Sequence, residues 1–212
     1  MSRRVLYLVS CAAPPALQIA TLIERAQGRG WDDVCLILTP TAATWLAGDL
    51  PELEKLTGHP VRSRYKLPRE PDVLPPASAM LACPATFNTL NKWALGITDA
   101  LAVGLLTEAI GLGLPLVALP YLNSAQAAHP ALARSVDVLT GAGVRVLLGE
   151  GGFTPLPPKQ GRLDLYPWDA ALDAFSRAPA GRDSGGRAPG QPRPPRPSTE
   201  RKWPTTDQGS QR

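Results

Sequence analysis

The stretch MLACPATFNTLNKWALGITD, residues 80–99, determines the predicted fold of this chain. It joins a short apolar run, residues 80–83, to a helical pattern that begins near Asn88, through a turn of small and hydroxyl-bearing residues. A continuous apolar run of this length is typical of a strand in a parallel sheet that is covered on both faces. The stretch therefore predicts a buried strand, a turn and a helix in succession.

The same order repeats on both sides of this stretch. Four further apolar runs predict strands, at Val5–Ser10, Val34–Leu38, Leu116–Leu119 and Val144–Leu148. Between them lie helical patterns, which often begin at proline and end at glycine, as helices prefer; they cover residues 14–28, 42–47, 88–96, 100–110, 125–142 and 168–175. Residues 50–76 hold six prolines, and little regular structure is predicted there. The alternation predicts an α/β fold, a three-layer parallel sheet with helices on both faces.

The composition divides the chain at about residue 175. Residues 176–212 carry eight Lys/Arg against three Asp/Glu, with seven prolines and five glycines. We expect a disordered Pro/Arg-rich tail there and one domain over residues 1–175. The net charge of +4 comes from the tail, and the preceding residues sum to −1. The charge therefore gives no indication of a nucleic-acid partner.

The apolar residues and the cysteines indicate in which cellular compartment the protein is expected. No run reaches the ~18–20 apolar residues that a membrane span needs, and the apolar N-terminal run is interpreted as a strand and not as a secretory signal. The three cysteines lie in or beside apolar runs, without a CxxC pair or a neighbouring histidine at ligand spacing. We expect reduced, buried thiols, no metal site, no membrane partner and a cytoplasmic protein.

Polar turns follow the first four predicted strands, and together they predict a ligand site. Parallel strands bring their carboxyl ends to one edge of the sheet, where ligands bind; the turns are Ser10–Pro15, Thr39–Thr41, Pro84–Asn91 and Pro120–Gln126. The third turn leads into a helix N-terminus, which suits a phosphate. Asn88 offers a paired donor and acceptor for an imide edge. The alternative is that Thr86 or Asn88 only caps the helix.

Two motifs carry a resemblance to a known family. PATFNTLNKWALGITD, residues 84–99, resembles the PASANT-type signature of the homo-oligomeric flavin-containing cysteine decarboxylases. Residues 120–123, Pro-Tyr-Leu-Asn, are similar to the Pro-x-Met-Asn motif of that family, with Leu122 at the methionine. The family includes phosphopantothenoylcysteine decarboxylase and enzymes that oxidise the C-terminal cysteine of lantibiotic peptides. The resemblance covers roughly residues 4–148. It implies a Rossmann-like, flavodoxin-like domain that binds FMN and assembles as a homo-oligomer, a trimer or a multiple of trimers.

The resemblance also assigns site residues. It implies that Asn123 contacts the substrate and that the cofactor contacts are Ser10, Thr39, Thr41, Pro84, Ala85, Thr86, Asn88 and Thr89. Where the family has Gly-Ser in the first turn, this chain reads Ser10-Cys11-Ala12-Ala13-Pro14. Phosphate contact then falls to Ser10 or to backbone N–H groups before Pro14. Trp45, Trp93 and Trp168 are interpreted as packing or oligomer contacts, with Trp93 the best candidate for stacking on a flavin.

Two positions depart from the family. Its catalytic histidine aligns with Asp72, and His59 lies thirteen residues too early. Its flap cysteine has no counterpart in residues 149–166. We therefore predict an FMN-binding, decarboxylase-like enzyme with an altered small-molecule or peptide substrate, with Asn123 and Asp72 at the catalytic positions. The alternative is a non-catalytic flavin-binding or regulatory subunit. Prenyl transfer to flavin ranks last, because the chain lacks the additional phosphate-binding arginines.

Overall fold

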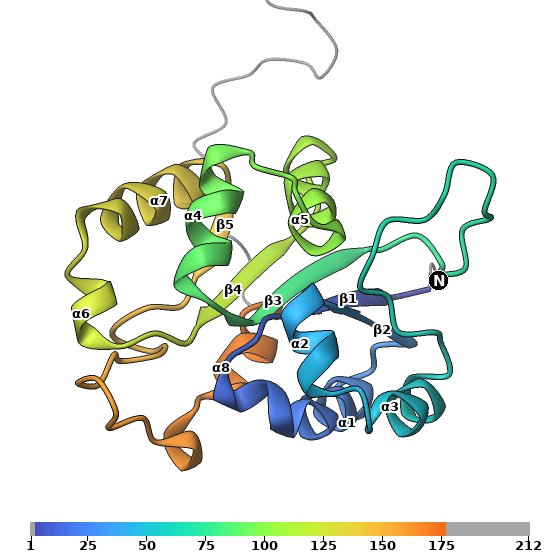
Figure 1. Cartoon of the computed structure of the whole chain (residues 1–212), viewed down its shortest axis with the longest axis horizontal. Coiled ribbons are helices and arrows are strands. Elements are labelled where there is room, and N and C mark those ends of the chain that lie inside the picture. Colours follow the sequence, from blue (N-terminus) through green and yellow to red (C-terminus); the bar gives the residue numbers. More distant parts are fainter. Residues whose placement is uncertain (1–2, 177–212) are drawn as a thin grey trace, which may run out of the picture. The chain divides into compact units, whose positions relative to one another are not determined.

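The computed structural model describes residues 3–176, which form a five-stranded, all-parallel sheet with helices on both faces (Figure 1). The strand order is β2-β1-β3-β4-β5, and the strands are β1 Val5–Ser10, β2 Asp33–Leu38, β3 Ala79–Ala85, β4 Leu116–Pro120 and β5 Val144–Val146. This confirms the predicted α/β class. The tail expected at residues 176–212 lies outside the described residues from residue 177 onward.

Burial of both faces explains the continuous apolar runs. Every residue of β1, β2, β3 and β4 is buried. The chain leaves β1 for β2 at one edge and then returns to the other side of β1 as β3. In doubly wound sheets of this order, the point where the direction reverses is where ligands bind. The topology therefore places a candidate site at the carboxyl ends of β1 and β3.

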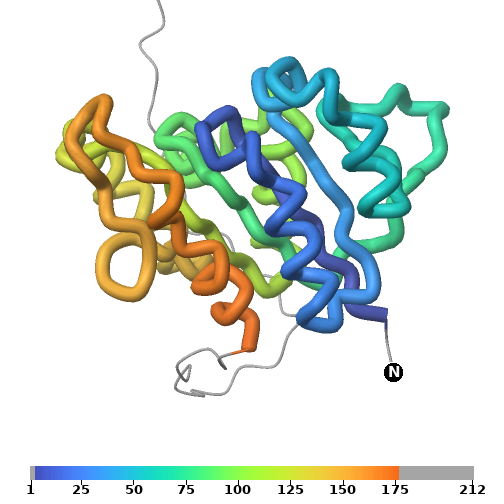
Figure 2. The backbone as a smooth tube through the Cα atoms, turned by 90° about the horizontal axis from the view of Figure 1, so that it is seen from below, coloured from blue at the N-terminus to red at the C-terminus, as the bar shows by residue number. Residues whose placement is uncertain are grey.

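The helices form two layers. One layer packs on the cluster that contains Leu8, Leu36 and Leu81, and it consists of η1 Pro14–Gln18, α1 Ile19–Gly28, α2 Pro40–Trp45, α3 Leu50–Thr57 and α8 Trp168–Asp173. The other packs on the cluster around Val9 and Ala82, and it consists of α4 Phe87–Leu95, α5 Leu101–Gly111 and α7 Pro130–Gly141. The short elements α6 Ser124–Ala127 and η2 Leu163–Leu165 lie beyond the strand ends. Figure 2 shows α1 and α8 in front of the sheet, where the two helices contact each other.

Two helix predictions were wrong in detail. The first eight of residues 50–76 form α3, because Pro51 occupies the first turn and Gly58 ends the helix with a φ of 69°. A proline in the first turn and a left-handed glycine at the end are favourable. The single helix expected over residues 125–142 is split into α6 and α7 at Pro130, and the His129 ring accepts a hydrogen bond from Ala131 N at 3.1 Å.

Asp33, at the start of β2, is a buried carboxylate beside the Arg3 guanidinium and the His59 ring. Its side chain is 4% exposed, and Oδ1 accepts a hydrogen bond from Arg3 Nη2 at 2.7 Å. His59 Nε2 lies 2.8 Å from the same oxygen. Burial raises the pKa of Asp33, but the contacts with His59 and Arg3 outweigh it and hold the pKa below its usual value. The folded state therefore favours the charged carboxylate.

We predict that Asp33→Asn lowers the free energy of unfolding by about 1–2 kcal/mol near neutral pH, discounted because Arg3 is largely exposed. The contribution is complete above the unfolded pKa of about 3.9 and is lost as the pH falls through the lower folded pKa. Urea unfolding across the acid range measures it. Asp49→Asn, at an exposed carboxylate without a side-chain partner among the described residues, is the control. An identical acid limb in both variants contradicts the prediction.

Candidate functional site

Backbone hydrogen bonds join the four predicted turns into one rim. Thr39 N donates to Ser10 O at 3.0 Å, Cys11 N to Pro84 O at 3.1 Å and Tyr121 N to Ala85 O at 2.9 Å. The turns after β2, β1, β3 and β4 therefore lie side by side, as the sequence predicts. Three strand spacings separate the ends of β2 and β4, so the rim is ~14 Å long. It is long enough for an extended ligand.

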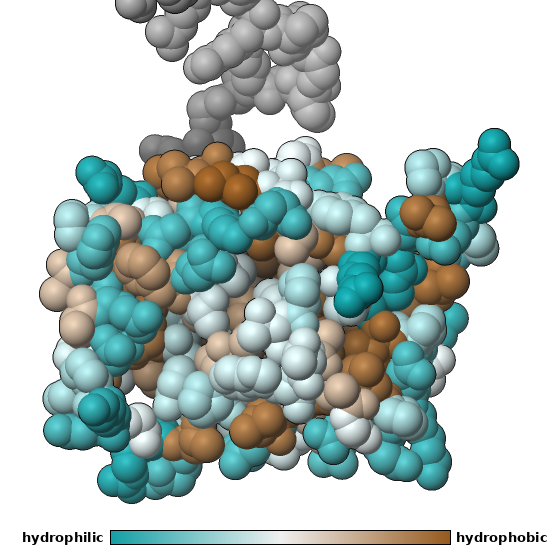
Figure 3. Space-filling model, in the orientation of Figure 1, coloured by the Kyte–Doolittle hydropathy of each residue, from teal (hydrophilic) through white to brown (hydrophobic). Residues whose placement is uncertain are grey.

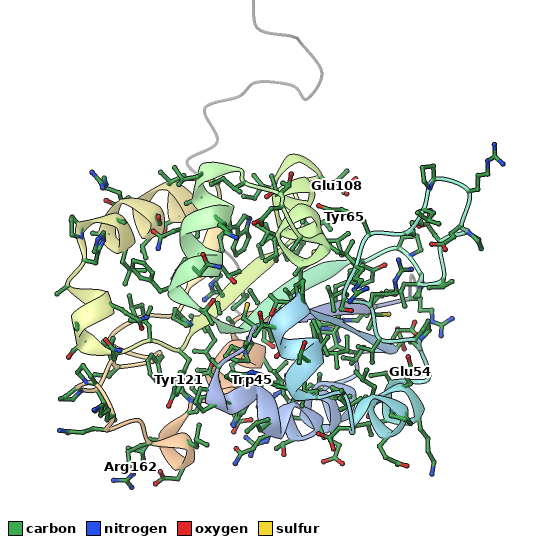
Figure 4. All side chains as sticks on the ribbon, viewed as in Figure 1. Trp45, Glu54, Tyr65, Glu108, Tyr121 and Arg162 are labelled. Atoms are coloured by element: carbon green, nitrogen blue, oxygen red, sulfur yellow. The ribbon has the colours of Figure 1, made fainter. Side chains whose placement is uncertain are left out.

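A cavity of about 930 Å³ opens above this rim. Its volume lies within the ~300–1,000 Å³ typical of small-molecule sites. The four turns supply one wall, and a segment after β5, residues 153–163, supplies the other. Figure 4 shows Tyr121, which follows β4, and Arg162, from that segment, in the lower left of the view. We call residues 153–163 the flap segment.

The predicted cofactor residues occupy this rim, five of them in the cavity wall: Thr39, Thr41, Thr86, Asn88 and Thr89. Pro84 and Ala85 are buried in β3 behind the wall, where their carbonyls accept the bonds that hold the neighbouring turns. Ser10 is fully buried at the end of β1. Asn123 lines the cavity from the end of β4. Their roles stay predictions.

In the turn before α4, one side chain caps the helix and another remains free to bind a ligand. Thr86 is the cap: its Oγ1 accepts from Thr89 N at 3.3 Å and lies 3.0 Å from Thr89 Oγ1. The Cys11 thiol donates to Thr89 Oγ1 at 3.2 Å, and burial raises the pKa of Cys11, so the thiol stays neutral. Asn88 is exposed to the cavity, and its amide has no partner within residues 3–176. Its donor and acceptor are available to a ligand.

The donors along the rim fit FMN. Ser10 Oγ is buried without a hydrogen-bond partner, which is costly unless a ligand or water completes it. The Ala12 amide N–H is also unpaired within the described residues. The first two residues of η1, Pro14 and Pro15, have no N–H group and therefore offer no backbone donor to a ligand. Thr41 adds a hydroxyl from α2. Hydroxyl and amide donors suit a phosphate, and the Asn88 amide suits the polar edge of a flavin ring.

The flap segment is held down by aromatic packing. The Phe153 ring lies 5.1 Å from that of Tyr121 and 5.7 Å from that of Tyr166. Tyr166 OH donates to Leu119 O at 2.9 Å, and burial raises its pKa well above the usual value. This wall was not predicted from the sequence. The signal was present as aromatic residues on either side of a proline-rich stretch.

Other predicted residues lie outside the cavity. Asp72 is on the loop before β3, 81% exposed, 2.6 Å from Lys66 Nζ, and it lines a separate cavity of about 390 Å³. His59 pairs with Asp33. Trp93 is buried and donates from Nε1 to Leu106 O at 3.0 Å, so the packing interpretation is confirmed. Trp168 is also buried, whereas Trp45 is about half exposed.

The remaining sequence expectations concern thiols, metals and membranes. Cys11, Cys35 and Cys83 are buried and free, as predicted. Within residues 3–176, no cluster of three His, Cys, Asp or Glu side chains has a metal-binding arrangement. In the same part of the chain, no helix has both the length and the apolar character to cross a membrane.

The comparisons with known proteins define the class. The model of the Flavoprotein family matches residues 3–173, and the chain belongs to this family. A search of curated proteins finds no match.

Solved structures share the fold. The FMN-dependent cysteine decarboxylase SpaF is 25% identical with a TM-score of 0.60, covering 81% of this chain and 97% of its own. The peptidyl-cysteine decarboxylase EpiD is 22% identical with a TM-score of 0.62, covering 83% and 100%. A dodecameric FMN-dependent UbiX-like decarboxylase from Escherichia coli O157:H7 is 15% identical with a TM-score of 0.62, covering 86% and 100%.

Proposed function

We propose that this chain binds FMN in the cavity at the β1/β3 switch point and acts as an FMN-dependent, decarboxylase-like enzyme. The observation that carries the proposal is the cavity of about 930 Å³, whose rim presents unpaired hydroxyl and amide donors at the point where a doubly wound sheet binds ligands. Membership of the Flavoprotein family and the fold shared with FMN-dependent decarboxylases support it.

Different residues of the rim would hold different parts of the cofactor. Ser10 and the Ala12 N–H hold the phosphate together with Thr39 and Thr41, and Asn88 holds the polar edge of the ring. Pro84 and Ala85, behind the wall, would hold the neighbouring turns in place through their carbonyls, and Thr86 and Thr89 would fix the turn that faces the cofactor. When bound, FMN supplies a two-electron oxidant. Asn123 orients the substrate, and the flap segment excludes water from it.

We further propose that the substrate or reaction differs from that of the cysteine decarboxylases. No cavity-lining residue in the described part of the chain is a histidine, and Cys11, on the rim, is the only lining cysteine there. Asp72, at the position of the family histidine, lies at a different cavity and acts at an FMN site only where a neighbouring subunit brings it there. The second candidate is a non-catalytic flavin-binding or regulatory subunit, which the same lack of a histidine favours.

We propose that the chain forms a homo-oligomer, a trimer or a multiple of trimers, through α5 and the loop before β3. Apart from Thr107 and Glu108, α5 consists of apolar residues and glycine, and such a helix is usually buried on all sides. Three exposed apolar side chains lie near it: Tyr65 donates to Ala100 O just before the helix, Val73 lines a cavity with Leu101 and Leu105, and Ile97 precedes the helix by four residues. Figure 3 shows hydrophobic patches on the face of the molecule that is seen in Figure 1, where α5 and the loop before β3 are visible. Light scattering tests the stoichiometry.

The buried thiols support a cytoplasmic site of action.

Asn88→Ala tests where the flavin lies. We expect the variant to fold, and its affinity for FMN to fall about three- to tenfold, because one or two net hydrogen bonds to the ring are lost. Titration of apo-protein with FMN, followed by flavin fluorescence, measures the change. Gln18→Ala, at an exposed amide without a side-chain partner among the described residues, is the control. An unchanged affinity in Asn88→Ala places the flavin elsewhere.

A further inference from the structure

Helix α4 lies between α5 and α7, and its remaining face borders the cavity (Figure 1). Ser135 Oγ of α7 donates to Asn91 Oδ1 at 2.7 Å, and Trp93 Nε1 donates to a backbone carbonyl of α5 at 3.0 Å. Residues 91 and 93 therefore contact the two neighbouring helices. Asn88 and Lys92, which lie one turn apart on the same face, both line the cavity instead.

The turn after α4 brings a carboxylate to Lys92. Gly96 ends the helix with a φ of 68°, and Ile97 N donates to Lys92 O at 2.9 Å. The chain reverses there, and Asp99 Oδ2 lies 2.5 Å from Lys92 Nζ although seven residues separate the two in the sequence. Both residues line the cavity, so an ion pair forms part of its wall.

Tyr65, from the loop before β3, holds the backbone on both sides of Asp99. Its hydroxyl donates to Thr98 O at 3.1 Å and lies 3.3 Å from Ala100 O. The hydroxyl lies so close to α5 that a Cβ at Gly104 would be 2.0 Å from it. These main-chain contacts fix the position from which the Asp99 carboxylate reaches Lys92.

The ion pair contributes little to the stability of the fold. The side chains of Lys92 and Asp99 are 30% and 52% exposed, and water screens the attraction between charges at such positions. The hydrogen bonds of Asn91 and Trp93 hold α4 against its neighbours without the pair. We therefore expect variants of Lys92 and Asp99 to fold.

Lys92 places a positive charge beside Asn88. The charged residues among the described lining are Lys92, Asp99 and Lys159, and Lys159 belongs to the flap segment on the opposite wall. Side chains four residues apart on a helix lie ~5–6 Å from each other at Cβ, as Asn88 and Lys92 do. Asp99 precedes α5 and is the more exposed member of the pair. The lysine is therefore the charge next to the amide assigned to the polar edge of the FMN ring.

We infer that Lys92, positioned by Asp99, sets the reduction potential of FMN in this cavity by stabilising the reduced ring. The inference rests on the proposed function. The ring carries one more negative charge after it has taken up two electrons and one proton, and this charge lies at the polar edge. The oxidised ring is neutral, so a nearby cation favours the reduced state. Lys92 acts through its charge, and Asp99 is a positioning residue that also offsets part of that charge.

Lys92→Gln removes the cation and leaves the Asp99 carboxylate in the wall. The full chain, loaded with FMN, is reduced anaerobically with dithionite beside a reference dye, and the visible spectrum gives the reduction potential of the flavin relative to the dye. We expect a lower potential, equivalent to a loss of about three- to tenfold in affinity for reduced relative to oxidised FMN, the size of one charge–charge interaction across ~6–8 Å at a partly exposed site. Lys55→Gln, at an exposed lysine of α3, is the matched control and keeps the wild-type potential.

Asp99→Asn changes the charge in the opposite direction. Lys92 then keeps its charge without a neighbouring carboxylate, so we expect a higher potential, by a similar factor. The double variant Lys92→Gln/Asp99→Asn removes both charges and is expected to lie between the two single variants. Lys92→Arg keeps the positive charge, and its potential is expected to stay above that of Lys92→Gln.

An ion pair with a purely structural role makes a different prediction. Both single variants break the pair, so they would shift the potential in the same direction or not at all, and either result overturns the inference. An equal loss of affinity for oxidised and reduced FMN in Lys92→Gln also overturns it, because the lysine would then act on the phosphate. Failure of the proposed function is a separate result, which appears as the absence of FMN uptake in the visible spectrum before any reductant is added.

Discussion

Gly152→Ala is expected to detach the turn after β5 and to destabilise the protein by about 3 kcal/mol, the upper end for overpacking. A Cβ at this position would lie 2.4 Å from both C and O of Leu147. These atoms are backbone and cannot rotate away. Phe153 N donates to Leu147 O at 3.0 Å, and Gly149 N donates to Phe153 O at 3.0 Å, so the clash falls within a closed turn.

The consequence of this clash extends to the cavity. Phe153 packs on Tyr121 and Tyr166 and lines the cavity, so opening the turn releases one end of the flap segment. Urea unfolding measures the loss of stability, and FMN titration measures the effect on the site. Gly141→Ala is the control, since a Cβ there meets nothing within 4 Å and lies in a helix, where alanine is favourable. Equal stabilities of the two variants contradict the structure of this turn.

Decarboxylation of a C-terminal cysteine is expected to be about 10²–10⁴-fold slower than in EpiD, because a positioned acid–base group contributes that factor. The described residues of the cavity include no histidine. Asp72 is exposed and paired with Lys66 beside another cavity. Release of carbon dioxide from the peptide DSYTC, the substrate peptide in a solved EpiD complex, is measured for both proteins side by side and gives the ratio.

Two variants identify the source of any residual rate. Because Asn123 and Asp72 are the proposed catalytic positions, Asn123→Ala and Asp72→Asn are each expected to lower the rate further. Asp49→Asn, far from both positions in the sequence, is the control and keeps it. A wild-type rate equal to that of EpiD contradicts the proposal that the reaction or substrate has changed.

The sheet was predictable from the sequence because strands buried on both faces have continuous apolar runs. Val5–Ser10 and residues 34–38 show such runs plainly, and both form strands. Leu50–Thr57 was missed because the prolines of residues 50–76 were counted together. Only Pro51 falls within the helix, in the first turn, where it is favourable.

The rim of the site was predictable, and the wall that faces it was not. The ends of parallel strands meet at one edge, so Thr39 and Asn88 could be placed together from their positions after strands. The flap segment lacks the periodicity of a helix or strand. Its position depends on tertiary contacts, such as the hydrogen bond that Leu156 O accepts from Ser124 N.

Whether the protein binds FMN is measured first by the visible absorbance spectrum of the purified protein, with mass spectrometry of the group released by acid. We predict a yellow protein that releases FMN at about one per chain, the stoichiometry of a single switch-point site. A colourless protein that takes up no added FMN would contradict it.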